Sequence, residues 1–261
     1  MAYVMRFLDS ICDLIPSLLQ YLLKPERLLL ALFWSFLVLC CVGWCFVADR
    51  FRIPVCVKRK FFHFIASVIF ITGIQYDPSF LCLASVAALS LFFTSEGVRI
   101  SGPRKISDAI SMAIAPFLDS KDQGIVIWSH IFLLLGLSMP LWLDLMAYQF
   151  RMHSVVSYAG VVTIGIGDSF AAIIGSYFGR IPWKGRNRTV EGSAAMLISQ
   201  ILFLEFIGLV DPVIFLNSAL QRRLAFIVHC VCTTAAEALL HGSDNVFIPL
   251  LSVMLVWPLR S

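Results

Sequence analysis

Charged residues are scarce in this sequence: Asp, Glu, Lys and Arg make up 14% of its 261 residues, whereas soluble domains contain about 25%. Hydrophobic residues make up 59%, against about 45–50% in soluble domains. This composition excludes an ordinary soluble domain and predicts a polytopic membrane protein. The net charge of +4 is too small to indicate a nucleic-acid-binding protein.

Several motifs that carry chemistry in soluble proteins are absent. The eight cysteines form no CxxC pair and most lie inside apolar runs, so we interpret them as buried hydrophobic residues rather than zinc ligands. No GxxxxGK motif occurs, and "GIGDSF", which begins at Gly165, has Phe170 where a dinucleotide fingerprint needs its third glycine. A phosphate loop of the soluble type is therefore excluded. The N-terminus also lacks the pattern of a cleaved signal peptide.

Apolar segments close to the roughly 20 residues that cross a bilayer recur along the chain. We predict an all-α fold, a polytopic transmembrane helical bundle with about 7–8 spans, the last of them marginal. The segments are Leu28–Ala48, Phe61–Ile74, Phe80–Thr94, Gly124–Leu143, Val155–Phe178, Ser193–Leu209, Leu224–Leu240 and Val246–Trp257. Residues 1–23 form an amphipathic start that ends before Pro25. Ile106–Leu118 is too short to span, so we expect it to be re-entrant or to lie on the surface.

The loops between these segments alternate in charge. The first, third and fifth loops are basic, whereas the second has no cation and the fourth has only Arg151. Cytoplasmic loops carry an excess of Lys and Arg, so we predict that the odd loops face the cytosol, although Arg222 and Arg223 in the sixth loop do not fit this rule. This topology brings several polar residues to the cytosolic face: Glu96, Asp168, the basic fifth loop, Glu191, Asp244 and Asn245.

Asp168 lies within the apolar run Val155–Phe178, where a charge costs about 2.5–3.5 kcal/mol on insertion scales. Either it caps a helix that begins after a break at Gly165 and Gly167, or it binds a metal or a phosphate; the two roles are compatible. The small residues that follow it at four-residue spacing, Ala171, Gly175 and Gly179, predict close contact with another helix.

The loop "GRIPWKGRNRTVEG" concentrates four cations, Arg180, Lys184, Arg186 and Arg188, just before Thr189 and Glu191. Such a cluster matches a polyphosphate. Thr189 is placed to cap the next helix, whose N-terminal amides then receive an anion. The alternatives are an ordinary positive-inside loop and contact with anionic lipid headgroups.

Glu237 lies in an apolar run seven residues before Asp244, about two helical turns. A carboxylate within a membrane span is a functional candidate. Asp244 and Asn245 offer the hard oxygen ligands that Mg²⁺ uses, or they form only a helix-ending turn.

Two further pairs of polar residues lie at the predicted cytosolic ends of spans. Arg59 and His63 are spaced i, i+4, and Glu96 and Arg99 are spaced i, i+3. They either support a site or contact a lipid headgroup, or they represent only snorkelling and a surface ion pair.

The residues "GDSFAAIIGSYFG", a basic loop and "RTVEGSAA" resemble the polyprenol kinase family, and within it the dolichol kinases most closely. "KRKFFHF", "SEGVR", "HIFLLLGLSMPLWL" and "EALLHGSDNVFIPL" resemble further landmarks of that family in the same order. The resemblance covers residues from about 55 to the end. It divides the chain into residues 1–54, an N-terminal interfacial helix and first span, and residues 55–261, a catalytic membrane domain.

The resemblance implies transfer of the γ-phosphate of CTP, with Mg²⁺ or another divalent metal, to dolichol, a membrane lipid. The product is the dolichyl phosphate used in protein N-glycosylation, made at the cytosolic face of the endoplasmic reticulum membrane. By position, the CTP and phosphate site takes Lys184, Arg186, Arg188, Thr189, Glu191 and Gly192. The metal ligands are Asp168, Glu191, Asp244 and Asn245, and the catalytic candidates are Asp168 and Glu237.

Two other functions remain open at this point. Related enzymes that use CTP on lipids, such as phytol or diacylglycerol kinases and CDP-diacylglycerol synthases, share the Gly-Asp and Glu-Gly pattern more loosely. An ion-coupled transporter also buries carboxylates such as Asp168 and Glu237, but it more naturally places them near the bilayer midplane within paired repeats.

Overall fold

The computed structural model describes residues 16–51, 53–115, 118, 122, 124–150, 153–211, 219–239 and 244–259. These residues form helices, and the pairing of Pro182 with Thr189 is the one β-bridge among them. The helices are α2 (Pro25–Arg50), α3 (Val55–Tyr76), α4 (Pro78–Ser101), α5 (Arg104–Ile114), α6 (Ser129–Ala147), η2 (Val155–Tyr158), η3 (Val161–Gly167), α7 (Asp168–Phe178), α8 (Val190–Val210), α9 (Ala219–Leu239), α10 (Asp244–Val256) and η5 (Trp257–Leu259). The predicted all-α fold is confirmed.

Within this described part of the chain, five helical segments are long and apolar enough to cross a membrane. They are Pro25–Cys45, Pro78–Ser101, Ser129–Ala147, Val155–Phe178 and Val190–Val210. A shorter apolar helical stretch covers Asn245–Leu259. The helices α3 and α9 have 22 and 21 residues, but their polar side chains, such as His63 and Arg223, keep them out of this group. The chain is thus a multi-pass membrane protein.

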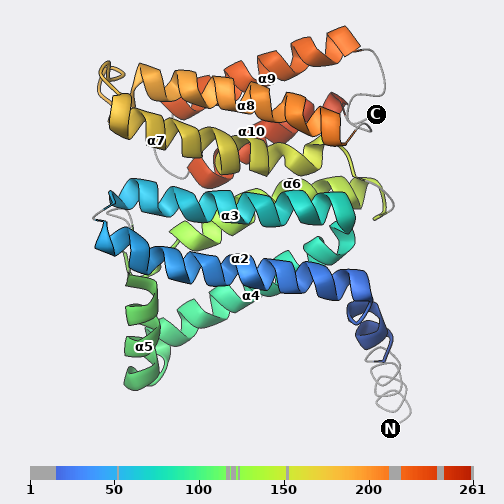
Figure 1. Ribbon diagram of the computed structural model, residues 1–261, viewed down its shortest axis with the longest axis vertical. Helices are drawn as coiled ribbons and strands as arrows, with labels where there is room; N and C mark the ends of the chain where they lie inside the picture. Colours follow the sequence, from blue (N-terminus) through green and yellow to red (C-terminus); the bar gives the residue numbers. More distant parts are fainter. Residues whose placement is uncertain are drawn as a thin grey trace.

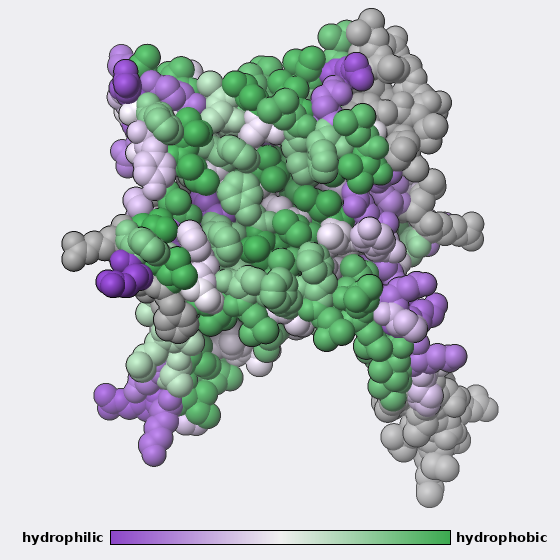
Figure 2. All heavy atoms as spheres, viewed as in Figure 1, coloured by the Kyte–Doolittle hydropathy of each residue, from purple (hydrophilic) through white to green (hydrophobic). Residues whose placement is uncertain are grey.

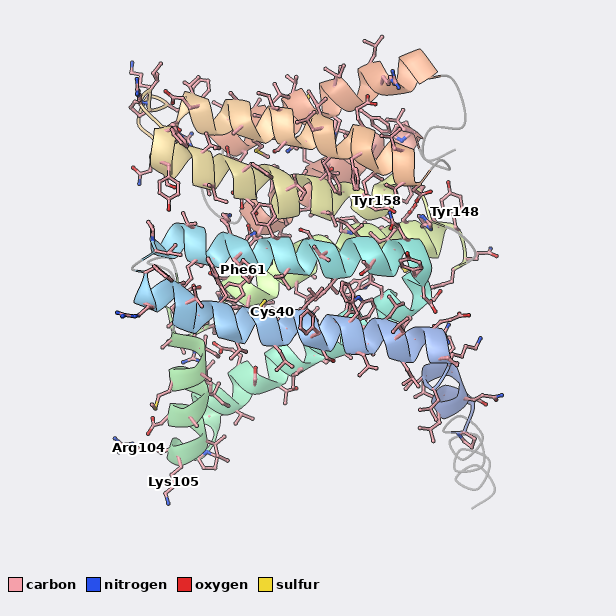
Figure 3. The ribbon with its side chains drawn as sticks, viewed as in Figure 1. Cys40, Phe61, Arg104, Lys105, Tyr148 and Tyr158 are labelled. Carbon is pink, nitrogen blue, oxygen red and sulfur yellow. The ribbon has the colours of Figure 1, made fainter. Side chains whose placement is uncertain are left out.

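The long helices run side by side, and Figure 1 shows α2, α3, α7 and α8 aligned in this way. Hydrophobic residues cover most of the face in Figure 2, whereas hydrophilic residues gather toward the two ends of the helices. The helix α5 is turned across this direction and carries Arg104 and Lys105 at the end that points away from the bundle (Figures 1 and 3). The prediction of a short helix that does not span is confirmed for Arg104–Ile114.

Polar contacts fix the end of α3 that lies far from the basic loops. Arg27 Nε donates to Asp77 Oδ2 at 2.6 Å, and Asp77 Oδ1 accepts from Phe80 N at 2.9 Å. Trp34 Nε1 donates to Thr72 Oγ1 at 3.0 Å. These bonds tie α2, α3 and the start of α4 together. Of the predicted amphipathic start, residues 1–15 lie outside the described residues and residues 16–22 are helical.

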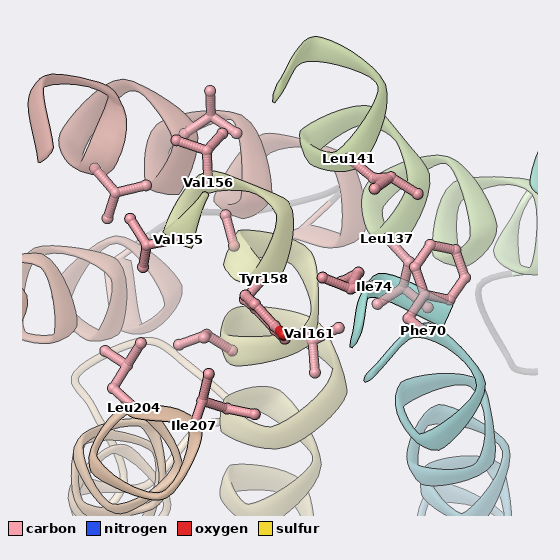
Figure 4. Packing of buried hydrophobic residues seen from close by; sticks show 14 of the residues in the cluster. Phe70, Ile74, Leu137, Leu141, Val155, Val156, Tyr158, Val161, Leu204 and Ile207 are labelled. Carbon is pink, nitrogen blue, oxygen red and sulfur yellow. The ribbon is translucent and has the colours of Figure 1, made fainter. Parts of the chain in front are cut away.

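Tyr158 lies at the centre of the hydrophobic core, packed among side chains such as Ile74, Leu137, Val161 and Ile207 (Figure 4). These residues come from η2, α3, α6, η3 and α8, so the core joins elements that are distant in sequence. Burial of apolar side chains of this size stabilises a soluble protein by about 1.5–3 kcal/mol each; between membrane helices, tight packing provides the corresponding gain.

The fifth predicted span, Val155–Phe178, is helical without the expected break at Gly165 and Gly167. Gly167 has helical backbone angles (φ −55°, ψ −60°), and a π-helical segment, η3, leads directly into α7. Of the two alternatives for Asp168, the capping role is contradicted, because no side-chain cap bond forms at the start of α7. Single π-helical turns are frequent at functional sites, and here one immediately precedes the buried aspartate.

Candidate active site

A cavity of about 640 Å³ lies at the end of the bundle where α3, α6, α8 and α10 begin and α7 and α9 end. Its walls thus come from helix termini that are widely separated in the sequence. The lining residues are Arg59, Lys60, His63, Asp122, Trp128, Ser129, Phe132, Asp168, Ala171, Ala172, Gly175, Ser176, Asn187, Arg188, Thr189, Gly192, Ser193, Glu237 and Asn245. Of the polar residues predicted to gather at one end of the spans, Asp168, Arg188 of the basic loop and Asn245 line this cavity, whereas Glu96 and Glu191 do not.

Asp168 forms an ion pair with Lys60 of α3 inside this cavity. The two side chains are 19% and 13% exposed, so the pair is largely removed from solvent. His63, one helical turn after Lys60, places Nδ1 4.0 Å from Asp168 Oδ2 and 3.5 Å from the carbonyl oxygen of Ile164. The first residue of α7 is thus held by the start of α3.

Arg188 forms a second ion pair across the cavity, with Glu237 of α9. The Glu237 side chain is 7% exposed and that of Arg188 is 24% exposed. An unpaired carboxylate at this depth is costly, and the guanidinium supplies the opposite charge. The pair links the basic loop to the last turn of α9, although the two residues are far apart in the chain.

The basic loop folds back on itself before α8. Trp183 N donates to Arg188 O at 2.8 Å, and Val190 N donates to Ile181 O at 2.9 Å. Gly185 supplies the left-handed backbone (φ 71°) at the tip, a conformation that glycine adopts without steric cost. These bonds bring Arg188 to the cavity side of the loop.

The start of α8 packs closely against α7. Thr189 Oγ1 accepts from Gly192 N at 3.2 Å and caps the helix, as the sequence predicts. A Cβ atom at Gly192 would lie 2.9 Å from the carbonyl oxygen of Ala171 and 3.4 Å from Gly175 Cα. The predicted close contact along the small residues of α7 is therefore confirmed, and it presents the first turn of α8 to the cavity.

Glu96 and Arg99 support the site from outside the cavity. Arg99 donates to both carboxylate oxygens of Glu96, at 2.7 and 2.8 Å, and also to the carbonyl oxygen of Ile125. Glu96 Oε1 accepts from Ile127 N at 2.7 Å. These bonds hold the segment that leads to Trp128 and Ser129, which line the cavity.

The structure brings together many of the predicted site residues and leaves others apart. Those that line the cavity are Arg59, His63, Asp168, Arg188, Thr189, Gly192, Glu237 and Asn245. Lys184 is exposed on the loop, and Arg186 is partly exposed; neither is among the lining residues. For Asp244 only the helical backbone is described.

Glu191 faces away from the cavity. Its two carboxylate oxygens lie 3.3 Å from Ile181 N and accept its hydrogen. The side chain borders an apolar groove between α7 and α8, together with Phe170 and Ile174. The one-residue step from Glu191 to Gly192 is a rotation of about 100° on a helix, which separates the two residues onto different sides of α8.

Eight polar or aromatic lining residues are not among the predicted site residues: Lys60, Asp122, Trp128, Ser129, Phe132, Ser176, Asn187 and Ser193. For Lys60 a signal existed, because it precedes His63 by one helical turn and so shares its face. Asp122 accepts from Ser129 Oγ at 2.6 and 2.7 Å, a contact that depends on how the loop before α6 folds. Nothing in the sequence pattern indicates that contact.

The donor set suits a metal that arrives with a polyphosphate. Among the described residues, no group of three His, Cys, Asp or Glu side chains lies close enough to form a metal centre on its own. Asp168, Glu237 and Asn245 nevertheless line one cavity. Mg²⁺ commonly takes only one or two carboxylates and completes its shell with waters and substrate phosphates.

Comparison with known proteins finds several relatives, all of them dolichol kinases. The chain is 33% identical over 255 residues to a dolichol kinase from Mus musculus, an alignment that covers 92% of this chain and 47% of that protein. It is 31% identical to a Homo sapiens dolichol kinase, covering 92% and 46%. With a dolichol kinase from Saccharomyces cerevisiae the identity is 27%, covering 89% and 42%. No family model and no solved structure matches the chain.

These relatives share similarity with nearly the whole chain. The chain spans about half the length of the curated relatives that it matches. Over about 90% of its own length, at about 30% identity, it is homologous to the dolichol kinases.

Proposed function

We propose that this chain transfers the γ-phosphate of CTP to dolichol and so produces dolichyl phosphate for protein N-glycosylation. The observation that carries the proposal is a single cavity, at one end of a membrane-embedded helical bundle, that combines Arg59, Lys60 and Arg188 with Asp168 and Glu237. Homology to dolichol kinases supports the choice of donor and acceptor. Phosphoryl transfer requires mainly positioning and neutralisation of charge, and this set of side chains supplies both.

The nucleotide phosphates bind at the start of α8 in this proposal. The planar guanidinium of Arg188 donates paired hydrogen bonds to phosphate oxygens. The amide of Gly192 and its neighbours, at the positive end of the helix dipole, add neutral donors. Lys184 and Arg186, on the loop that leads to α8, attract the nucleotide from solvent. Glu191, whose carboxylate bonds to Ile181 N on the other side of α8, is left out of the site.

The carboxylates complete the reaction centre. Asp168, Asn245 and, next to it, Asp244 are the proposed ligands for Mg²⁺, which when bound neutralises the charge that develops on the phosphates. Asp168 or Glu237 accepts the proton of the dolichol hydroxyl as that oxygen attacks the γ-phosphorus. The bond between the γ-phosphorus and the bridging oxygen to the β-phosphate breaks, and CDP leaves. Arg59 and His63 line the same cavity and orient the lipid end that carries the hydroxyl. Trp128 and Phe132 give this wall the apolar surface that an isoprenoid needs.

The membrane arrangement is also part of the proposal. To the five apolar spans we add α3, α9 and α10, which gives the 7–8 spans expected from the sequence. The cavity end carries the basic loops, and Lys- and Arg-rich loops remain in the cytosol. The active site therefore faces the cytosol, in the endoplasmic reticulum membrane, with residues 55–261 as the catalytic domain.

The test uses membranes that contain the protein, dolichol, Mg²⁺ and CTP labelled either in its terminal phosphate or in its cytosine. Label that reaches the lipid only from the terminal phosphate supports the kinase. Transfer of the cytosine label to an added lipid phosphate would identify a cytidylyltransferase instead. No transfer of either label by correctly inserted protein would overturn the proposal. The Asp168→Asn variant controls for other kinases in the membranes.

A further inference from the structure

Lys60 is a charged residue of the cavity to which the proposed function gives no separate role. Its ammonium group pairs with the carboxylate of Asp168, and the Lys60 side chain is 13% exposed. It comes from α3, whereas the other proposed phosphate-binding groups come from the loop before α8 and from α8 itself. Lys60 therefore reaches the cavity from a different element than these groups.

The same pattern occurs twice in the cavity. Lys60 forms an ion pair with Asp168, and Arg188 forms an ion pair with Glu237. Each pair joins two different elements, and each combines one group suited to phosphate with one group suited to a metal or a proton. In the ligand-free protein the charges are thus matched internally, so a metal ion that binds Asp168 must first displace an ammonium group.

We propose that Lys60 is a phosphate-binding residue whose transfer from Asp168 to the nucleotide couples nucleotide binding to metal binding. The inference rests on the proposed function, because it takes the ligand to be a nucleoside triphosphate with a divalent cation. When the polyphosphate enters, the ammonium of Lys60 moves onto its oxygens and the carboxylate of Asp168 becomes free for the cation. Metal and nucleotide therefore bind together, and each alone binds weakly.

The two partners differ in how freely they can move. Lysine carries a compact charge on a flexible four-carbon stem, so its ammonium can shift by several ångströms while the helix stays in place. Asp168 begins a helix that is packed against α3: the rings of Phe64 and Phe170 meet edge to face at 5.5 Å, and a Cβ at Gly165 would overlap Ser67 Oγ. The lysine side chain moves, and the aspartate stays where the cation needs it.

This arrangement has a thermodynamic consequence. A nucleotide that removes Lys60 from Asp168 raises the affinity for the cation, and by linkage the cation raises the affinity for the nucleotide by the same factor. Coupling factors between two sites are typically about 5–150-fold. Replacing Lys60 with a residue of similar length and no charge removes the competitor from Asp168 and so lowers the coupling to the part that comes from direct contact between the cation and the phosphates.

The experiment measures Mn²⁺ binding by electron paramagnetic resonance on the full chain in phosphatidylcholine nanodiscs. Titrations are run with and without β,γ-methylene CTP and without acceptor lipid. For the unsubstituted protein we expect the Mn²⁺ Kd to fall at least about tenfold when the nucleotide analogue is present. For Lys60→Met we expect tighter Mn²⁺ binding without nucleotide, a coupling factor clearly smaller than that of the unsubstituted protein, and weaker binding of the analogue.

Further variants keep the result decisive. Lys60→Arg preserves the positive charge, so coupling should persist, and Lys105→Met on the exposed α5 should change nothing. If Lys60→Met weakens Mn²⁺ binding or leaves the coupling intact, Lys60 only holds Asp168 in place and the inference fails. That result would leave the proposed kinase activity standing. Failure of the unsubstituted protein to bind the analogue with Mn²⁺ would instead overturn the nucleotide site itself, and the inference with it.

Discussion

Arg188 and Glu237 join the basic loop to the last turn of α9 through an ion pair whose carboxylate side chain is only 7% exposed. Residues that lie in separate, distant segments of the sequence therefore close one side of the cavity together. In the proposed site the same contact would serve two purposes, because it stabilises the fold and positions the guanidinium for phosphate.

The first purpose predicts a non-additive pair of substitutions. Arg188→Met leaves the Glu237 carboxylate buried without its cation, a change that typically costs about 3–5 kcal/mol. Adding Glu237→Gln removes the unpaired charge, so the double variant should recover at least half of that loss in the free energy of unfolding. Denaturant unfolding in detergent micelles measures the free energy of unfolding of the single and the double variant. Equal stability of the single and double variants would contradict this account, because it would show that the unpaired Glu237 carboxylate is not the source of the loss.

Asp168→Asn should abolish turnover in the assay with labelled CTP. The amide keeps the size of the side chain but neither binds a metal well nor accepts a proton, and each such role is worth about 10²–10⁴-fold in rate. Since the substitution also removes the partner of Lys60, size-exclusion chromatography and circular dichroism are needed to confirm folding. Near-normal turnover would contradict the site assignment.

Gly192→Ala should separate α7 from α8 and damage the cavity. The added Cβ meets the carbonyl oxygen of Ala171 at 2.9 Å, and overpacking of this kind costs about 1–3 kcal/mol. Turnover should fall by a larger factor than this loss of stability alone explains, because the proposed phosphate site lies at the first turn of α8. Gly43→Ala on α2 is the matched control, since nothing lies within 4 Å of its Cβ. Equal behaviour of the two variants in thermal unfolding would count against a close helix seam.

Glu96→Ala should loosen the segment that leads into α6. The carboxylate accepts from Ile127 N at 2.7 Å, and hydrogen bonds to charged groups contribute about 1.5–3 kcal/mol. Hydrogen exchange of the Ile127 amide should accelerate about 10–100-fold, and the KM for CTP should rise more than kcat falls. Asp108→Ala is the control, because its ion pair with Arg104 is exposed and long, at 3.9 Å. Unchanged exchange at Ile127 would exclude the supporting role.

Much of this architecture follows from local patterns in the sequence. The apolar runs predict the main spans, and Thr189 followed by an apolar stretch predicts the cap that is found. Asp168 and Glu237 stand out because charges are rare inside such runs. These features depend on neighbouring residues only, so periodicity and composition are sufficient to identify them.

What could not be predicted depends on rotation and on contacts across the bundle. The π-helical segment η3 directly precedes Asp168 and so affects the direction of its side chain. No residue pattern in "GIGDSF" predicts a π-helix there. Glu191 and Gly192 are adjacent, yet the angle at which α8 begins sends them to different sides. The partner of Asp168, Lys60, lies more than one hundred residues earlier, a pairing that only the tertiary packing of α3 against α7 determines.

The cavity can be completed only late in the synthesis of the chain. Asn245 of α10 lines the cavity. Its carbonyl oxygen lies so close to Gly136 of α6 that there is no room for a side chain at that position. During synthesis at the membrane, α3, α6, α7 and α8 are all inserted before Glu237 and Asn245 emerge from the ribosome. A product that terminates prematurely after α8 would therefore enter the bilayer with its basic loop and Asp168 in place, but without the residues that close the site.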